Sequence, residues 1–258
     1  GIWVVYLIRV QLREDYSNLI FYLSPLVAVA LTLFFGSFIF LILDLSPIES
    51  IKIFFMSPIS NSYGISELFV KATPLAIIAL GLSYCFKNNI YNIGAEGQLT
   101  MGAIFGGGIG LLFNESTSIF LLPLMILFGA IGGAFWATIP AILKTKFNTN
   151  EILTSLMLTY VALFILDYFV VGPWKDPAGY GLPKSMPFPD AGRLPVLFDG
   201  LRVHIGVYFA IIICFITYIV YNKTLFGFKL KVSGLSSKAS QYAGFKYKNL
   251  IFYTFIIS

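Results

Sequence analysis

The chain has 258 residues, of which 58% are apolar, 17% aromatic and only 11% charged, and its formal net charge is +5. Charged residues make up about a quarter of an ordinary soluble domain, so the composition excludes that class and predicts an all-α, polytopic integral membrane protein embedded in a lipid bilayer. The positive charge does not indicate a nucleic-acid partner, because the lysines cluster beside apolar runs, where they set membrane topology.

Apolar runs predict about seven membrane helices in a bundle. Each of the first six is long enough to cross the ~30 Å hydrocarbon core. The runs cover residues 23–43, 68–86, 93–113, 119–143, 152–171 and 205–221, and a seventh starts at residue 250. Residues 44–67 are expected to be a polar connection. The whole of residues 1–258 is therefore predicted to be a single transmembrane domain.

Both ends of the sequence are expected to be incomplete. The first residue is Gly1 rather than Met, and Ser258 falls inside an apolar run. Residues 1–18 are expected to be an interfacial amphipathic helix or the remnant of a longer element, and the pattern does not decide between the two.

Residues 88–98, NNIYNIGAEGQ, are unusually polar for their position between two apolar runs. A hairpin exposed to the cytoplasm would explain them. A broken helix inside the membrane would also explain them, because irregular backbone and a carboxylate at depth are tolerated where protein or a water-filled path surrounds them. In that interpretation Asn92, Gly94, Glu96 and Gln98 line or gate a pathway, and Glu96 is the most consequential of them.

The third and fourth runs carry small residues four positions apart. Gly102, Gly106 and Gly110 repeat in one run, and Gly129 and Gly133 repeat in the next. Small residues at this spacing let helix backbones approach closely in lipid. We therefore expect close helix packing there rather than a ligand role for any single glycine.

Residues 172–204 contain six of the twelve prolines and no long apolar run. Proline fixes φ and removes a backbone donor, so this segment is predicted to be a rigid, irregular outer loop.

Residues 223–248 carry six lysines and no acidic residue between two apolar runs. Lysine beside a spanning helix is retained on the inner side, so the segment is predicted to be a cytoplasmic loop. With the N-terminus also inside, eleven of the 17 Lys and Arg residues fall on the cytoplasmic side.

Within this loop, Ser236 is a suitable N-cap and Gly244 a suitable residue to follow a helix, which predicts a two-turn helix between them. Its apolar face would carry Leu235, Ala239, Tyr242 and Ala243. Such a helix either lies on anionic lipid or docks a cytoplasmic partner.

The sequence carries no pattern typical of catalysis or of a cofactor or metal site. Cys85 and Cys214 lie in apolar runs without CxxC spacing, and His204 is the single histidine. A Walker A sequence, a nucleophile elbow and an HExxH motif are all missing. We therefore expect a transport protein rather than an enzyme, with no cofactor.

Three separated motifs resemble the permease subunits of bacterial ABC importers for nucleosides and simple sugars, in the branched-chain amino acid/ribose-type permease family. Residues 86–98, FKNNIYNIGAEGQ, match F-[RK]-x-G-x-[FY]-N-I-G-A-E-G-Q, with Asn89 where glycine is usual. Residues 144–160, KTKFNTNEILTSLMLTY, match K-x-x-[FY]-x-[VT]-N-E-[VI]-[ILV]-[ST]-[ST]-[LI]-M-[LM]-[NT]-Y. Residues 227–245, GFKLKVSGLSSKASQYAGF, match the family's loop between two membrane helices, with Lys231, Ser233 and Ser236 as mild departures.

The resemblance implies a role for each motif. The loop at 223–248 would be the coupling segment that rests in a groove of a separate ATP-hydrolysing subunit, through Gly234, Leu235, Ala239, Tyr242 and Gly244. Asn150 and Glu151 start the fifth run, where helix capping explains them sufficiently; a second cytoplasmic contact or a gating role is the alternative.

The resemblance also implies the surroundings of the chain. A second permease subunit, like or unlike this one, would complete the pathway in the bacterial inner membrane, and an outer solute-binding protein would face residues 172–204. Nucleosides are the expected solute and simple sugars the alternative. The competing class is a gradient-driven secondary carrier or channel, which is disfavoured because the runs contain only two acidic residues, Glu96 and Asp167, both near the predicted ends of their spans.

Overall fold

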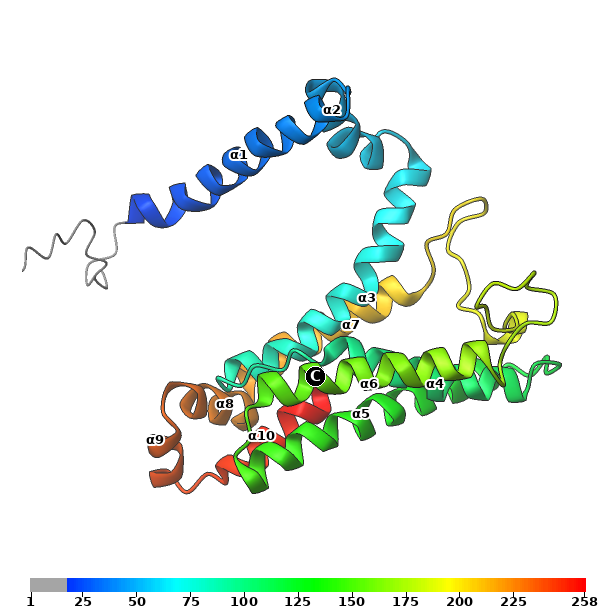
Figure 1. The fold of residues 1–258 in the computed structure, drawn as a ribbon. Helices are drawn as coiled ribbons and strands as arrows, with labels where there is room; N and C mark the ends of the chain where they lie inside the picture. The colour runs from blue at the N-terminus through cyan, green and yellow to red at the C-terminus, as the bar shows by residue number, and fades with distance from the viewer. Residues whose placement is uncertain (1–17) are drawn as a thin grey trace, which may run out of the picture. The chain divides into compact units, whose positions relative to one another are not determined.

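The computed structural model describes residues 18–258, so the amphipathic helix or remnant expected at residues 1–18 lies almost wholly outside the described residues (Figure 1). The described chain is helical, with no β-strand between residues 18 and 258, which confirms the predicted all-α class. It divides into two units at residues 65 and 66.

The first unit contains α1 (Asn18–Ile42), α2 (Pro47–Met56) and the short 3-10 helix η1 (Ser57–Ile59). Helix α2 lies in the segment expected to be a polar connection, and the sequence analysis did not predict a helix there. Its start follows ordinary capping chemistry: the Ser46 hydroxyl accepts a hydrogen bond from the Glu49 amide at 3.5 Å, and Pro47 occupies the first helical turn.

The second unit contains most of α3 (Ser62–Lys87) and all later helices. These are α4 (Ala95–Leu112), α5 (Leu121–Phe147), α6 (Glu151–Val171), α7 (Gly206–Lys223), α8 (Leu225–Leu235), α9 (Ser237–Tyr242) and α10 (Tyr247–Ile257). Within residues 18–258, five helices are long and apolar enough to cross a membrane: α1, α3, α5, α6 and α7.

The other two expected spans are not among these five helices. Helix α4 begins at Ala95 rather than at residue 93, and its first turns contain Glu96 and Gln98, so its apolar part is short. Helix α10 has 11 residues. The expected count of about seven is therefore approximate.

Helices α4 and α5 run side by side and make the most extensive helix–helix contact in the second unit (Figure 1). A Cβ atom added at Gly106 would lie 2.7 Å from the Met125 carbonyl oxygen, and one at Gly102 would lie 3.0 Å from the Gly129 carbonyl oxygen. Only glycine allows backbones this close, so the predicted packing through small residues is confirmed.

Buried apolar residues tie the remaining helices to this pair. Met101, Ile104, Trp136 and Ala162 join α4, α5 and α6. A second cluster joins the end of α3 to α5 and α10, and it consists of Cys85, Ile90, Ala141, Ile251 and Phe255.

Residues 172–204 are irregular apart from the 3-10 helix η2 (Asp190–Gly192) and two isolated bridges. The segment is held by aromatic contacts, with the Trp174 ring stacked on Phe169 at 4.5 Å between centroids. The predicted irregular backbone is present.

Candidate functional site

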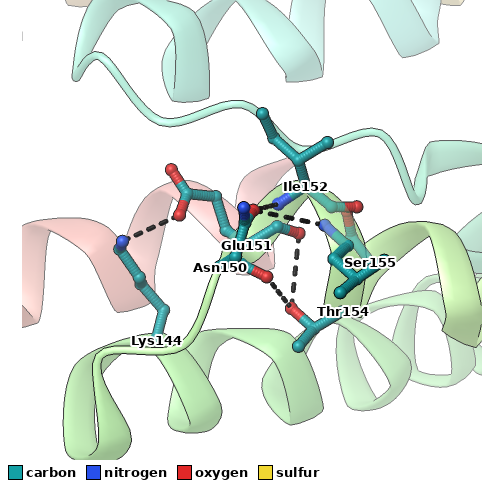
Figure 2. A network of polar contacts seen from close by, with 7 residues as sticks. Lys144, Asn150, Glu151, Ile152, Thr154 and Ser155 are labelled. Atoms are coloured by element: carbon teal, nitrogen blue, oxygen red, sulfur yellow. Dashed lines mark hydrogen bonds and ion pairs between the residues drawn. The ribbon is translucent and has the colours of Figure 1, made fainter.

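The junction of α5 and α6 holds Asn150 and Glu151. Helix α5 ends at Phe147, and Asn148 then adopts a left-handed conformation with φ 52°, which turns the chain. The Asn150 side-chain oxygen accepts hydrogen bonds from the Ile152 amide at 3.0 Å and the Leu153 amide at 3.3 Å (Figure 2). Asn150 is thus the N-cap of α6, as its position in the sequence indicates.

Glu151 forms an ion pair across this junction. Its carboxylate lies 2.7 Å from the Lys144 ammonium of α5, and the two side chains expose only 14% and 20% of their surface (Figure 2). The carboxylate also lies in the first turn of α6, where the helix dipole favours negative charge. The pair therefore fastens the end of one helix to the start of the next.

The segment at residues 88–98 interrupts the chain between α3 and α4. Asn89 has φ 56°, a conformation that asparagine tolerates better than most residues, and it stands where the family pattern has glycine. Asn88 and Asn92 are fully buried, with 0% and 1% of their surface exposed. The observed form is a buried interruption between two helices.

Side chains and close backbone contacts hold this interruption against α6. The Ile93 amide donates a hydrogen bond to the Ser155 hydroxyl at 3.1 Å, and the Gly94 amide donates to the Asn92 side-chain oxygen at 2.9 Å. A Cβ atom at Gly94 would lie 2.8 Å from the Ser155 carbonyl oxygen. Gly94 is therefore required by the close approach of α6.

Glu96 and Gln98 follow in the first turns of α4 and lie in different surroundings. Glu96 is exposed, whereas Gln98 exposes only 7% of its surface. The Gln98 side-chain oxygen lies 3.5 Å from the Ser258 hydroxyl, which in turn accepts a hydrogen bond from the Asn92 side-chain nitrogen at 2.8 Å. Asn92 and Gln98 thus belong to one polar network.

Helix α9 is the two-turn helix predicted in the lysine-rich segment. The Ser236 hydroxyl accepts a hydrogen bond from the Ala239 amide at 3.2 Å, and Gly244 follows the helix with φ +76°. Ser240 is fully buried and anchors the helix, whereas Leu235 and Tyr242 expose 80% and 93% of their surface. Ala239 and Ala243 are also exposed. Leu235, however, ends α8 and is separated from α9 by the extended Ser236 cap, so the four residues predicted to form one face are all exposed but do not lie on one helix.

Gly234 directly precedes Leu235 near the end of α8 and contacts the interruption between α3 and α4. A Cβ atom there would collide with the Lys87 carbonyl oxygen and would lie 3.5 Å from the Asn88 carbonyl carbon. The end of α8 therefore presses directly on the start of residues 88–98. Helix α8 itself was expected only as part of a loop, although Thr224, which caps it by accepting a hydrogen bond from the Gly227 amide at 3.2 Å, is a signal for its start.

Three residues of this region were missed from the sequence alone. Lys144 pairs with Glu151, and Ser155 and Ser258 bind residues of the interruption. The serines carry no local signal, because a hydroxyl inside an apolar run usually bonds its own helix. No cluster of residues suited to a metal ion occurs within residues 18–258.

The sequence matches a protein family described as "Branched-chain amino acid transport system / permease component" over residues 64–258. No solved structure matches the chain significantly.

Curated relatives are similar over most of the chain. A "Glucose ABC transporter permease protein" of Haloferax volcanii is 34% identical over 248 residues, which is 92% of this chain and 64% of the relative. A "Guanosine ABC transporter permease protein" of Bacillus subtilis is 30% identical over 242 residues, 92% of this chain and 68% of the relative. A "Nucleoside ABC transporter permease protein" of Lactococcus lactis subsp. cremoris is 28% identical over 243 residues, 92% of this chain and 67% of the relative. The chain thus spans about two thirds of the length of these relatives.

Proposed function

Since the chain belongs to the family of branched-chain amino acid transport system permease components, we propose that it is the membrane-spanning subunit of an ATP-driven ABC importer for nucleosides. It is a multi-pass membrane protein with several helices able to cross a bilayer. In this proposal ATP hydrolysis takes place on a separate partner subunit, and this chain supplies the pathway.

The observation that carries the proposal is the exposure of Leu235, at the end of α8, and of Tyr242, on α9. Leu235 and Tyr242 are almost fully exposed on a segment that is otherwise rich in lysine. Large apolar side chains exposed on and next to a short, capped helix are typical of a protein docking surface, and aromatic side chains are common anchors in such interfaces. The partner that fits is the groove of an ATPase subunit on the cytoplasmic side.

The contact between Gly234 and Lys87 supports a route for coupling. When the ATPase moves α9, the end of α8 moves with it and pushes the start of residues 88–98. Asn92, Gly94, Glu96 and Gln98 then change position at the entrance to α4 and gate the pathway. Asn150 and Glu151 hold α6, which contacts the same segment through Ser155.

The remaining partners follow from the same assignment. A second permease, like or unlike this chain, completes the pathway, and a solute-binding protein docks at residues 172–204 on the outer face. The N-terminus and residues 223–248 lie in the cytoplasm of a bacterial cell, because lysine-rich segments are retained on that side.

Relatives named for guanosine and for nucleosides favour a nucleoside as the solute. A simple sugar is the second candidate, since a relative at 34% identity is named for glucose.

The test is uptake into proteoliposomes that hold the full-length permease, its ATPase and its binding protein. Labelled nucleosides and glucose are offered with and without enclosed ATP, and with an imposed ion gradient. The proposal expects nucleoside uptake that requires ATP and is competed by unlabelled nucleosides. ATP-dependent uptake of glucose alone would identify a sugar, rather than a nucleoside, as the solute. Gradient-driven uptake without ATP would contradict the proposal that the chain belongs to an ATP-driven importer.

A further inference from the structure

Helix α8 lies at the ends of two helices that are long and apolar enough to cross a membrane. It begins at Leu225, one residue after α7 ends at Lys223. Near its other end, a Cβ atom at Gly234 would collide with the carbonyl oxygen of Lys87, the last residue of α3. The Lys87 ammonium lies 5.9 Å from the centroid of the Tyr221 ring, so α3 and α7 end on the same side of the membrane. Helix α8 therefore lies where both of them leave the hydrocarbon core.

One side of α8 is buried against the rest of the unit. Gly227, Leu230 and Ser233 are the buried residues of the helix, and their spacing of three places them on one side. Leu230 is fully buried and packs in a cluster with Tyr84 of α3 and Leu250 of α10. These contacts fix the rotation of α8 about its axis.

The other side of α8 is apolar and exposed. Leu225, Phe228 and Leu235 expose 64%, 54% and 80% of their surface, and Val232 between them is half-buried. At about 3.6 residues per turn, these four positions share one face. A helix on the surface of a soluble protein carries polar residues on its outer side, so this helix differs from one that lies in water.

Lysines border the exposed apolar face of α8. At helical spacing Lys231 lies on one border and Lys229 on the other, and Lys223 comes directly before the helix. Lys223 and Lys231 are exposed, whereas Lys229 is half-buried. Residues 200–258 contain no acidic residue, and none of the three lysines forms an ion pair within residues 18–258. Their charge is therefore free to meet an anion outside the chain.

An apolar face bordered by lysines is typical of a helix that lies in the plane of a membrane surface, with its apolar side chains among the acyl chains and its ammonium groups among the headgroups. We propose that α8 is such an interfacial helix and that its lysines bind the headgroups of anionic phospholipids. Leu235, the last residue of α8, is left to the docking of the ATPase, so the lipid face consists of Leu225, Phe228 and Val232. Lysine on both borders favours lipid over a protein partner, because both borders of an inserted helix reach the same layer of headgroups.

Quenching by labelled lipids tests this contact in the full-length permease, reconstituted in mixtures of phosphatidylcholine and phosphatidylglycerol. Phe228→Cys in a Cys214→Ser background takes a bimane fluorophore, while Cys85 is fully buried and stays unlabelled. Phosphatidylglycerol with a nitroxide on its acyl chain should quench this fluorophore more strongly than equally labelled phosphatidylcholine at the same mole fraction. The control is Phe215→Cys on α7, also 64% exposed but without a lysine within a turn, where both lipids should quench equally.

A lysine variant separates headgroup binding from mere contact with lipid. Each lysine near a membrane surface raises the affinity for anionic lipid roughly fivefold, so Lys231→Gln should lower the enrichment of phosphatidylglycerol at position 228 by about that factor. Quenching by phosphatidylcholine should persist, because the helix stays in place. Lys238→Gln is the matched control, since Lys238 is equally exposed but lies on α9, and it should keep the enrichment.

Three results would overturn the proposal. Equal quenching by the two lipids at position 228 would mean that the lysines do not select anionic headgroups. Quenching by aqueous iodide but by neither lipid would mean that this face of α8 lies in water. Protection from iodide and from both lipids would mean that a second permease or the ATPase covers the face. Uptake is not measured, so the outcome does not depend on the proposed solute or on ATP.

Discussion

The Lys144 ammonium lies 2.7 Å from the Glu151 carboxylate, across the turn that joins α5 to α6 (Figure 2). Both side chains are more than three quarters buried, so solvent screens the pair less than an ordinary surface pair. The pair holds Glu151 and the Asn150 cap binds the amides of the next two residues, so both interactions fix the start of α6, one turn before Ser155 contacts residues 88–98.

The ion pair is expected to stabilise the fold measurably. A double-mutant cycle with Lys144→Met and Glu151→Gln should give a coupling free energy of about 1–2 kcal/mol, between the values of exposed and buried pairs. Unfolding of the purified permease in detergent measures it. The control is the Arg193–Asp190 pair at 3.1 Å, whose side chains are 59% and 95% exposed and whose coupling should be much smaller. Equal coupling in both pairs would contradict the prediction.

Asn150→Ala should lower the stability of the permease by about 1 kcal/mol, because two amides of α6 lose their acceptor. Asn150→Ser retains a cap and should keep both stability and uptake. If the Asn150→Ser permease is as stable as the wild type but transports poorly, helix capping does not explain this residue sufficiently, and a gating role follows.

Tyr242→Asp should abolish co-purification with the ATPase subunit and leave membrane insertion intact. The side chain is 93% exposed and makes no intramolecular packing that the change would disturb. Tyr180→Asp is the control, since Tyr180 is equally exposed but lies in residues 172–204, on the proposed outer face. Normal co-purification of the Tyr242→Asp permease would refute docking through α9.

Gly234→Ala should destabilise the permease by about 1–3 kcal/mol, because the added methyl group collides with the Lys87 carbonyl oxygen. Gly36→Ala in α1 is the control, and its effect on stability should be absent or of opposite sign. No described atom lies within 4 Å of that position, so the change should be neutral or should raise stability by up to about 1 kcal/mol. Thermal unfolding of the two variants is compared, and equal shifts would mean that α8 does not press on residues 87–88.

Glu96→Gln should reduce ATP-driven uptake severalfold and change stability little. Glu96 is exposed in the first turn of α4, so the neutral side chain gives up only a favourable dipole interaction of about 0.3–1 kcal/mol. Uptake and the amount of assembled complex are measured together. Unchanged uptake would return Glu96 to a purely structural role.

Local chemistry made much of the fold predictable. Asn150 and Ser236 are caps because their side-chain oxygens reach amides two or three residues ahead, and Gly244 ends α9 because it tolerates positive φ. The glycine repeats of α4 and α5 likewise predicted a packed pair, since helical spacing places them on one face. These features depend on residues within about one turn of each other.

The sequence by itself therefore determined the all-α class, the membrane helices, the caps and the position of the exposed helix α9. Only the tertiary structure decided which residues meet across the chain: Glu151 with Lys144, Gly234 with Lys87, and Gln98 with Ser258. It also decided that Gln98 is buried while Glu96, two residues earlier, is exposed. The physical reason is that burial depends on the neighbouring helices, whose placement is set by packing over the whole unit rather than by the residues nearby in sequence.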